Sequence, residues 1–198
     1  MSIDALLTQL ANAIDAEEDK TAEALVKELT PEAEPTVRQW AQSGNADQRW
    51  WAVRALAQCG TAQSIPTLLG TLTDADPALR AVTALAIGTL HAQLGASLTP
   101  HLAQLAERLT DEDGMARQAA ADALIHCGDS AIESLVAVLR HSPNEGARSR
   151  AAYALRKIGT PATVPALFRA LNDPNYLVHT YAHEGLDEMG LLETLLVQ

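Results

Sequence analysis

A motif that recurs along the chain constrains its fold more than any other feature of the sequence. Each copy places Arg, then Ala or Thr, then Ala-Leu or Ala-Ile, at the same offsets from its start. Four clear copies begin at Arg49, Arg80, Arg117 and Arg148, with spacings of 31, 37 and 31 residues. A fainter copy begins at His179 and a degenerate one at Glu18. A period between about 20 and 50 residues is typical of repeat proteins, in which each copy is one supersecondary unit.

Each copy predicts two helices joined by a tight turn. The segment after the Arg has helical spacing of small apolar residues, and the next segment carries leucines at i, i+1 and i+4, such as Leu68, Leu69 and Leu72. Glycine at the expected helix ends and proline in the expected first turns agree with this division. One pair of helices cannot bury both of its apolar faces, whereas stacked pairs can. We therefore predict an all-α fold, an α/α superhelix or solenoid of about six antiparallel helix pairs.

The whole chain, 1–198, is predicted to form one repeat domain. Residues 1–44 would be degenerate N-terminal repeats, 45–175 the regular repeats, and 176–198 a degenerate C-terminal cap. Six extra residues near 91–101 account for the longer spacing, and insertions in solenoids are expected as loops at one edge; a simple longer turn is the alternative. An apolar stripe near the C-terminus either caps the last unit or pairs with another chain; it consists of Leu191, Leu192, Leu195 and Leu196.

Two stretches carry a resemblance to a known family. "TDADPALRAVTALAIGTL" at 73–90 and "GARSRAAYALRKIGTPATVPALFRALND" at 146–173 resemble HEAT repeats of the short phycobilisome-lyase-like type. The resemblance covers nearly the whole chain and is weakest before residue 35 and after residue 175. It implies that the first helices form a convex side and the second helices a concave side. Such repeats occur in bilin lyases, assembly factors and adaptors, so the resemblance implies a fold more than an activity.

Charge and composition narrow the class of partner. With 25 acidic and 14 basic residues the net charge is −11, which argues against broad electrostatic binding of nucleic acid or anionic lipid. The sequence shows no basic leader and no uncharged run of 18 apolar residues, so neither a signal peptide nor a membrane span is predicted. Cys59 and Cys127 occupy the same core position two units apart, and we expect both to be buried free thiols in a reducing cytoplasm.

The repeat arginines are predicted to be structural. An Asn or Asp lies four residues before each one, at the expected helix start: Asn45, Asp76, Asp113 and Asn144. That spacing lets the side-chain oxygen cap the helix while it pairs with Arg on the same or a neighbouring unit. We therefore expect Arg49, Arg80, Arg117 and Arg148 to form a ladder between repeats with Asp76 and Asp113, in preference to a stripe that binds phosphate.

The candidate partner-binding residues lie mainly on the polar faces of the second helices. They are Gln39, Trp40, Thr67, Thr71, Gln104, Glu107, Arg108 and Arg169. The tryptophans of the protein all fall within residues 40–51, and Trp50 and Trp51 belong to a first helix. At least one of Trp50 and Trp51 is expected to be exposed as a partner-binding anchor, unless the first unit folds over it. Packing in the core is the alternative interpretation of these aromatic residues.

The sequence contains few candidate residues for binding a metal or cofactor. His179 and His183 have the i, i+4 spacing of a metal site, with Glu184 beside them. HEAT-type deoxyhypusine hydroxylases have similar His-Glu dipeptides, which bind iron and occur in several repeats. This chain has one such dipeptide. We therefore predict no metal, no cofactor and no catalytic residue, and take His179 as the degenerate counterpart of the repeat arginine.

Charge is uneven along the chain, and this bears on what could dock. Residues 1–47 hold 10 acids and 3 bases, a net charge of −7, whereas residues 140–169 hold 6 bases and 1 acid, a net charge of +5. An acidic partner segment could dock on the basic stretch; a solvated face that keeps the protein soluble is the alternative.

Together these features predict a non-enzymatic scaffold or adaptor that binds another protein through its concave face, as a monomer or weak homodimer in the cytoplasm. A bilin-lyase-like enzyme subunit, or a chaperone for a cofactor or an assembly, is the alternative that the resemblance implies. Nucleic-acid handling, as in HEAT-like DNA glycosylases, is disfavoured by the net charge and by the few basic residues on second helices.

Overall fold

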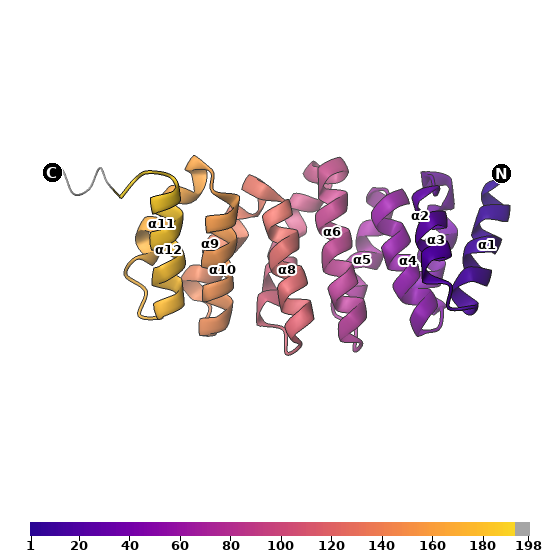
Figure 1. The fold of residues 1–198 in the computed structure, drawn as a ribbon, viewed down its shortest axis with the longest axis horizontal. Coiled ribbons are helices and arrows are strands. Elements are labelled where there is room, and N and C mark those ends of the chain that lie inside the picture. Colours follow the sequence, from indigo (N-terminus) through magenta and orange to yellow (C-terminus); the bar gives the residue numbers. More distant parts are fainter. Residues whose placement is uncertain (193–198) are drawn as a thin grey trace. The chain divides into compact units, whose positions relative to one another are not determined.

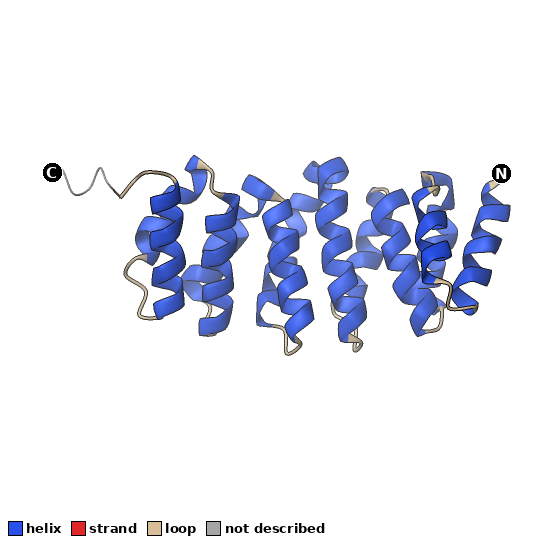
Figure 2. Ribbon diagram, in the orientation of Figure 1, coloured by secondary structure: helices blue, strands red, loops and turns tan. Residues whose placement is uncertain are grey.

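The computed structural model describes residues 1–192, so Leu195 and Leu196 of the apolar stripe lie outside the described residues. Within that range the chain is helical, with turns between the helices and no strand (Figure 2). The α-helices are α1 (Ile3–Asp15), α2 (Asp19–Lys27), α3 (Glu34–Ser43), α4 (Ala46–Cys59), α5 (Ile65–Thr71), α6 (Pro77–Leu98), α7 (Leu102–Glu107), α8 (Gly114–His126), α9 (Ile132–His141), α10 (Glu145–Ile158), α11 (Val164–Ala170) and α12 (Tyr176–Glu188). Short 3₁₀ helices lead into or out of several of them: η1 (Pro31–Ala33), η2 (Ala62–Ser64), η3 (Thr99–His101), η4 (Arg108–Thr110), η5 (Gly128–Ala131) and η6 (Pro161–Thr163).

The chain divides into two compact units, residues 1–98 (unit 1) and residues 99–198 (unit 2). The division falls inside the lengthened segment 91–101, between the first and second helices of one repeat. A single continuous domain over 1–198 stays a prediction.

In unit 1 the first helices of successive repeats pack side by side. α4 contacts α2 on one side and α6 on the other, while α3 packs against α4 and α5 (Figure 1). The contact surface is made of small and branched residues, with Ala52, Ala55 and Leu56 of α4 at most 1% exposed. Alanine lets the helix axes approach closely, and leucine fills the space that remains.

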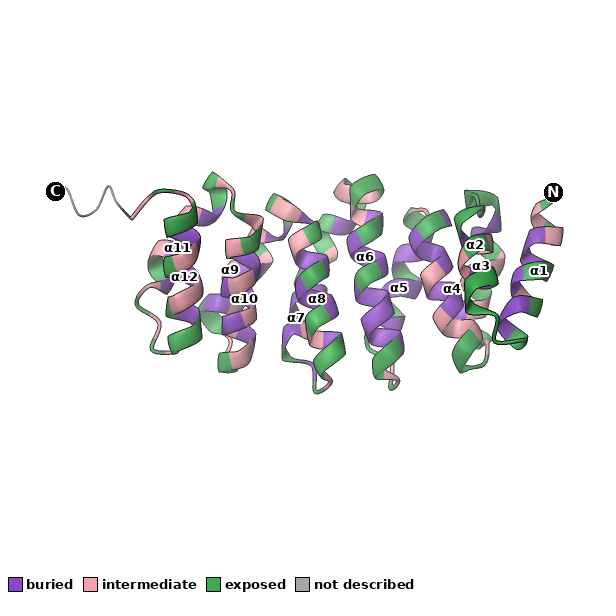
Figure 3. Cartoon of the chain, viewed as in Figure 1, coloured by how far each residue is buried: buried purple, intermediate pink, exposed green. Residues whose placement is uncertain are grey.

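Unit 2 repeats this arrangement. α10 contacts both α8 and α12, α9 packs against α7 and α10, and α11 packs against α12. Ala151, Ala154 and Leu155 of α10 are fully buried and occupy the repeat positions of Ala52, Ala55 and Leu56. Figure 3 shows the same mixture of buried and exposed residues along α10 as along α4. The α-solenoid predicted from the repeat is thus the fold of each unit.

The pairing of helices begins one helix later than a simple count of pairs suggests. Among residues 1–192 there are twelve α-helices, the number in six pairs. The repeat motif, however, places the Arg-containing first helices at α2, α4, α6, α8, α10 and α12. The chain therefore has a second-type helix, α1, before the first pair, and α12 follows the last complete pair.

Each regular first helix starts where the sequence places a side-chain cap. Asn45, Asp76, Asp113, Asn144 and Asn175 each accept a hydrogen bond from a backbone N–H of the first turn, at 2.8 to 3.2 Å. These N–H groups have no partner inside the helix, so the cap supplies one. Proline occupies the first turn of α3, α5 and α11, as predicted, because its missing N–H costs nothing there.

The lengthened segment is helical, and the prediction of a loop or longer turn at 91–101 is wrong. α6 continues from Pro77 to Leu98 with one departure from helical dihedrals, at Leu94 (φ −113°, ψ 17°). Leu98 is fully buried, so burial of its side chain favours continuation of the helix over a solvated loop. By length and composition alone, residues 77–110 could cross a membrane, but half of the most apolar window is buried in the protein, as in a core helix.

The two cysteines are buried, as predicted, and both are free thiols. Burial raises the pKa of each thiol to about 12, with the negative charge of Glu34 adding to the effect at Cys59. Both therefore stay protonated at neutral pH and pack as small apolar groups.

Candidate functional site

The repeat arginines are held by the backbone that precedes their own helices. Arg80 Nη1 donates hydrogen bonds to the carbonyl oxygens of Asp74 and Ala75, at 2.8 and 3.1 Å. Arg117 Nη1 reaches the carbonyl oxygen of Asp111 at 2.7 Å in the same way. The guanidinium thus holds the loop between two repeats in place and donates hydrogen bonds to carbonyl oxygens that have no partner within a helix.

Two of these arginines also bind a carboxylate of the next repeat. Arg148 donates from Nε and Nη2 to the two carboxylate oxygens of Asp173, at 3.0 and 3.3 Å. Arg49 forms the equivalent ion pair with Asp74. The partner in each pair is the acid two residues before the helix cap. This corrects the prediction that the capping residue itself would pair with the arginine: the capping oxygens are occupied by backbone N–H groups.

These ion pairs hold the carboxylates in their charged form. The hydrogen bond from Arg49 lowers the pKa of Asp74, and one from the backbone N–H of Asp76 adds to this. Burial opposes ionisation of Asp173, but hydrogen bonds from Arg148 and from the backbone N–H of Asn175 lower its pKa overall. The bidentate contact is the stronger kind of charge-assisted hydrogen bond and joins one repeat to the next.

One rung of this ladder has no acid. The position equivalent to Asp74 and Asp173, six residues before the repeat arginine, is Ser142 in the repeat that begins at Arg148. Among residues 1–192, Arg117 donates only to the carbonyl oxygens of Asp111 and Glu112, at 2.7 and 2.9 Å. Its charge is therefore not neutralised by a carboxylate as those of Arg49 and Arg148 are.

The predicted residues on the second helices differ widely in exposure. Gln39, Gln104, Glu107 and Arg169 are exposed, whereas Trp40 is half-buried. Arg108 is also half-buried and lies 3.9 Å from carboxylate oxygens of both Glu107 and Asp111, so ion pairs already surround it. These side chains do not gather into one cavity.

Thr67 and Thr71 were predicted to contact a partner, and the structure corrects this. Their exposed fractions are 6% and 5%. Thr67 Oγ1 accepts a hydrogen bond from Gln42 Nε2 at 3.0 Å, and Thr71 Oγ1 accepts one from Thr83 Oγ1 at 3.0 Å. Thr71 Oγ1 also lies 3.1 Å from the carbonyl oxygen of Leu68. Both threonines therefore link helices inside unit 1.

A buried carboxylate that sequence reasoning missed lies nearby. Glu34 is 4% exposed and accepts hydrogen bonds from the hydroxyls of Thr61 and Ser64. Burial alone would raise its pKa, but these hydrogen bonds lower it overall. Because its acceptors are occupied by side chains of η2 and the preceding turn, Glu34 fastens the start of α3 to the next repeat.

A cavity bordered by two of the predicted tryptophans opens between α2 and α4 in unit 1. It has a volume of about 690 Å³, and we call it the tryptophan pocket; it is lined by Asp19, Lys20, Glu23, Ala24, Lys27, Asp47, Trp50 and Trp51. Trp50 and Trp51 meet edge to face, with ring centroids 5.1 Å apart and planes at 81°. Trp51 is 9% exposed and Trp50 is half-buried, because α2 of the degenerate first unit flanks them.

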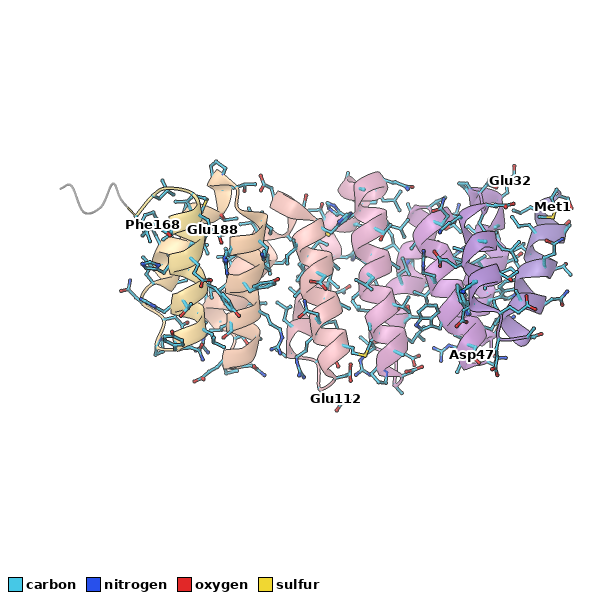
Figure 4. The ribbon with its side chains drawn as sticks, in the orientation of Figure 1. Met1, Glu32, Asp47, Glu112, Phe168 and Glu188 are labelled. Carbon is cyan, nitrogen blue, oxygen red and sulfur yellow. The ribbon has the colours of Figure 1, made fainter. Side chains whose placement is uncertain are left out.

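The polar groups of the tryptophan pocket are only partly paired. Glu23 is 2.5 Å from Arg54 Nη2 and 3.8 Å from Lys27 Nζ, so its charge is matched inside the protein. Asp19 and Asp47 are exposed and have no ion-pair partner among residues 1–192; Asp47 lies at the start of α4 (Figure 4). Neither indole N–H has a hydrogen-bond acceptor among the same residues. The pocket thus combines an aromatic wall with two free carboxylates.

A second cavity, of about 420 Å³, opens between first helices in unit 2. We call it the tyrosine pocket; it is lined by Gln118, Glu145, Gly146, Ser149, Arg150, Tyr153, Asn175, Leu177 and Tyr181. Tyr153 and Tyr181 meet edge to face with ring centroids 5.5 Å apart, and Lys157 Nζ is 5.7 Å from the Tyr153 centroid. This pocket therefore has an aromatic wall like the first, but a cationic surrounding.

The two pockets occupy the same place in the repeat. Each lies between one first helix and the next, α2 and α4 in unit 1 and α10 and α12 in unit 2. Counting from the residue at the repeat-arginine position, Lys20 and Arg150 share a position on the earlier helix, and Trp51 and Tyr181 share one on the later helix. Nothing in the sequence alignment of the repeats indicated which grooves are wide enough to hold a ligand.

The candidate metal residues come together only in part. His179 and His183 are exposed on α12, with ring centroids 6.4 Å apart. Glu184 instead pairs with Arg156, which also donates to both carboxylate oxygens of Glu188 at 3.1 and 3.2 Å. Residues 1–192 contain no group of three or more side chains of the His, Cys, Asp or Glu type close enough to hold one ion.

Several solved structures have a similar arrangement of the chain. A crystal structure of an engineered protein from a structural genomics consortium has a TM-score of 0.55 at 18% identity, covering 96% of this chain and 97% of that one. A designed armadillo repeat protein gives 0.48 at 16% identity, covering 90% and 98%. Human deoxyhypusine hydroxylase in complex with glycerol gives 0.34 at 19% identity, covering 93% and 94%. At such identities the first of these likenesses supports the fold alone.

Sequence comparison identifies the family. No curated protein matches the chain. A family model of HEAT repeats matches residues 3–88, 71–155 and 99–187, so successive matches overlap and together span nearly all of the described residues. The phycobilisome-lyase-like subtype stays a prediction. Helix pairs with capped first helices, arginines anchored in the turns and a shared alanine–leucine core agree with this match, and the chain belongs to the HEAT-repeat family.

Proposed function

We propose that the protein is a non-enzymatic scaffold that binds another protein, and that the tryptophan pocket is one of its docking sites. The observation that carries the proposal is the pocket itself: about 690 Å³ bordered by two tryptophans and by carboxylates without partners. Tryptophan is the residue most enriched among those that dominate binding energy at protein interfaces. Docking on the concave face stays a prediction beside this proposed site between first helices.

The chemistry of the pocket favours a cationic side chain of the partner. An Arg or Lys placed over the face of Trp50 would gain a cation–π interaction, and Asp19 and Asp47 could accept its hydrogen bonds. The surrounding residues 1–47 carry a net charge of −7, which attracts a basic segment at long range. Lys20 and Lys27 also border the pocket, but Lys27 is held near Glu23.

A titration of the full chain with a short arginine-rich peptide tests this proposal. Every tryptophan of the protein lies within residues 40–51, so intrinsic fluorescence reports on this region without a label. We expect the basic peptide to change the emission of the protein and a matched glutamine peptide to leave it unchanged. Asp47→Asn should weaken binding about tenfold, because it removes one charge-assisted hydrogen bond.

Trp40 provides a matched control. Trp40→Phe removes a tryptophan of the same region that does not line the pocket, and it should leave the affinity for the basic peptide unchanged. Trp50→Phe should weaken binding, because the phenyl ring is the poorer cation–π partner. If the peptide binds equally well to the Trp50 and Trp40 variants, the tryptophan pocket is not the docking site.

The proposed setting is a reducing cytoplasm, where Cys59 and Cys127 would remain thiols. This proposal rests on the sequence, in which two cysteines two repeats apart form no disulfide framework. Fractionation of the native host, with the protein detected by antibody, would test the location directly.

A further inference from the structure

The tyrosine pocket contains a guanidinium that the protein itself does not neutralise. Arg150 is half-buried, and among residues 1–192 no carboxylate or carbonyl oxygen accepts a hydrogen bond from it. Arginine is rarely taken out of water without such a partner, because the lost hydration must be replaced by hydrogen bonds. Burial, and next the charge of Arg117, lower the pKa of the Arg150 guanidinium, although it stays protonated at neutral pH.

The missing rung of the arginine ladder explains why positive charge accumulates here. Arg117, close enough to act on Arg150, has Ser142 at the position where Arg49 has Asp74 and Arg148 has Asp173, so it lacks a carboxylate partner. Lys157 adds a third cationic group beside Tyr153. Arg148 and Arg156, by contrast, are paired with the acids Asp173, Glu184 and Glu188. An anion placed in the pocket would therefore meet the positive charges of Arg150, Arg117 and Lys157.

The lining also supplies neutral groups that suit a carboxylate with an apolar neighbour. The phenol hydroxyls of Tyr153 and Tyr181 have no hydrogen-bond partner among the described residues, so both are free to donate. Leu177, at the edge, is 48% exposed, and the adjacent Tyr176 is 77% exposed. An aromatic and apolar rim of this kind contributes binding energy beyond that of the charged contact.

One acidic group, Glu145, lines the pocket and accepts a hydrogen bond from Asn175 Nδ2 at 3.0 Å. Its repulsion of a bound anion and the attraction by Arg150, Arg117 and Lys157 both grow with the charge of that anion. The choice of a Glu or Asp side chain therefore rests on the neutral and apolar groups of the rim.

We propose that the tyrosine pocket is a second docking site, in which Arg150 and the two tyrosine hydroxyls bind a carboxylate from an acidic, leucine-containing segment of a partner protein. Arg150 can present two N–H groups to the two carboxylate oxygens, a geometry that guanidinium and carboxylate share. The site goes beyond the proposed function above, because it would bind a carboxylate whether or not the tryptophan pocket binds a cation.

The test is a titration of the full chain, enriched in ¹⁵N, with a short synthetic peptide of alternating glutamate and leucine. Two matched peptides replace glutamate by glutamine or by phosphoserine. We expect the glutamate peptide to shift the Nε–Hε signal of Arg150 and backbone signals of α10 and α12, and the glutamine peptide to shift neither. Arg150→Gln should weaken binding about tenfold or more, because the charge-assisted hydrogen bonds are lost.

Arg140→Gln is the matched control, since it makes the same change of charge at an exposed arginine of the same basic stretch that does not line the pocket. It should leave the affinity within about twofold, because an exposed charge acts mainly at long range. Equal weakening by the two substitutions would show general charge attraction and overturn the proposal.

Tyr181→Phe keeps the ring that packs against Tyr153 and removes only the hydroxyl, so it tests the site even if the Arg150 variant folds poorly. It should weaken binding of the glutamate peptide while leaving thermal unfolding unchanged. Tighter binding of the phosphoserine peptide would overturn the choice of carboxylate. Self-association that Arg150→Gln abolishes, without any effect on peptide binding, would assign the pocket to a second copy of the chain and overturn the proposal. Failure of the basic peptide to bind unit 1 would leave this result unaffected.

Discussion

The tryptophan pocket and the tyrosine pocket are built on the same backbone and differ in the charge they present. Each lies in a groove between neighbouring first helices, and each has an edge-to-face aromatic pair in its wall. Both units have a base at one shared position of the groove, Lys20 in unit 1 and Arg150 in unit 2. Unit 1 has the acids Asp19 and Asp47 at the positions where unit 2 has Ser149 and Leu177. The repeat thus determines where a groove lies, while a few surface positions determine which charge it attracts.

The cores of the two units should be alike, and substitutions there should have the largest effect on stability. Leu56 in α4 and Leu155 in α10 occupy one repeat position, and both are 0% exposed. Truncation of either one to alanine should cost about 3 kcal/mol in the free energy of unfolding, as lost burial and a cavity add together. Urea unfolding followed by circular dichroism measures this. A cost in one unit that is several times that in the other would show that the cores are not equivalent.

Alanine substitutions at two glycines should change stability in opposite directions, because the two helices are packed differently around them. A Cβ at Gly185 of α12 would lie 3.0 Å from Leu167 Cδ1 and 3.2 Å from Arg156 Cβ, so Gly185→Ala should destabilise the protein by about 1–3 kcal/mol. Gly70 of α5 has nothing within 4 Å of the added Cβ, so Gly70→Ala should stabilise it by about 0.5–1 kcal/mol through helix propensity. Thermal unfolding of both variants checks the pair; a change of the same sign in both would contradict the packing described for α12.

The arginine ladder gives a prediction that depends on pH. Because the folded-state pKa of Asp173 lies below its unfolded value, its ion pair with Arg148 contributes stability above the unfolded pKa, about 3.9, and loses it as pH falls through the folded pKa. Asp173→Asn should therefore cost about 1–2 kcal/mol at pH 7, and the difference from wild type should disappear in strong acid. Unfolding measured from neutral to acidic pH tests this; a cost that persists unchanged in acid would argue against the ion pair.

The missing rung predicts the smallest effect and links the ladder to the tyrosine pocket. Ser142→Asp would give Arg117 the carboxylate that Arg49 and Arg148 already have, and should stabilise the protein by about 0.5–1 kcal/mol. It should also weaken binding of the glutamate peptide, since it lowers the positive charge around Arg150. If stability rises and peptide binding does not change, Arg117 does not contribute to the charge of the pocket.

The sequence predicted the fold because the signals that set it are local. The caps Asn45, Asp76, Asp113 and Asn144 mark helix starts by hydrogen bonds within one turn, and the alanine and leucine positions follow helical spacing. The prediction of a loop or longer turn near 91–101 was wrong because the sequence of an insertion does not show whether its residues will be exposed to solvent or buried. Burial of Leu98 favours a helix there.

The candidate sites were less predictable because they depend on contacts between repeats. Thr67 and Thr71 look like polar surface residues in the sequence, yet Gln42 and Thr83 of neighbouring helices cover their hydroxyls. Conversely, the free charge of Arg150 could not be inferred from its own repeat. The charge around Arg150 depends on which side chains of α8 and α12 lie close to it. It also depends on position 142, where the residue is Ser and not Asp.

The most direct test of the central claim is one experiment on one sample: titration of the ¹⁵N-enriched full chain with the arginine-rich peptide and, separately, with the glutamate–leucine peptide. Our account predicts that the basic peptide shifts signals of α2 and α4 and leaves α10 and α12 unchanged, and that the acidic peptide does the reverse. If both peptides shift the same helices, or neither shifts any, equivalent grooves of the repeat do not select partners of opposite charge.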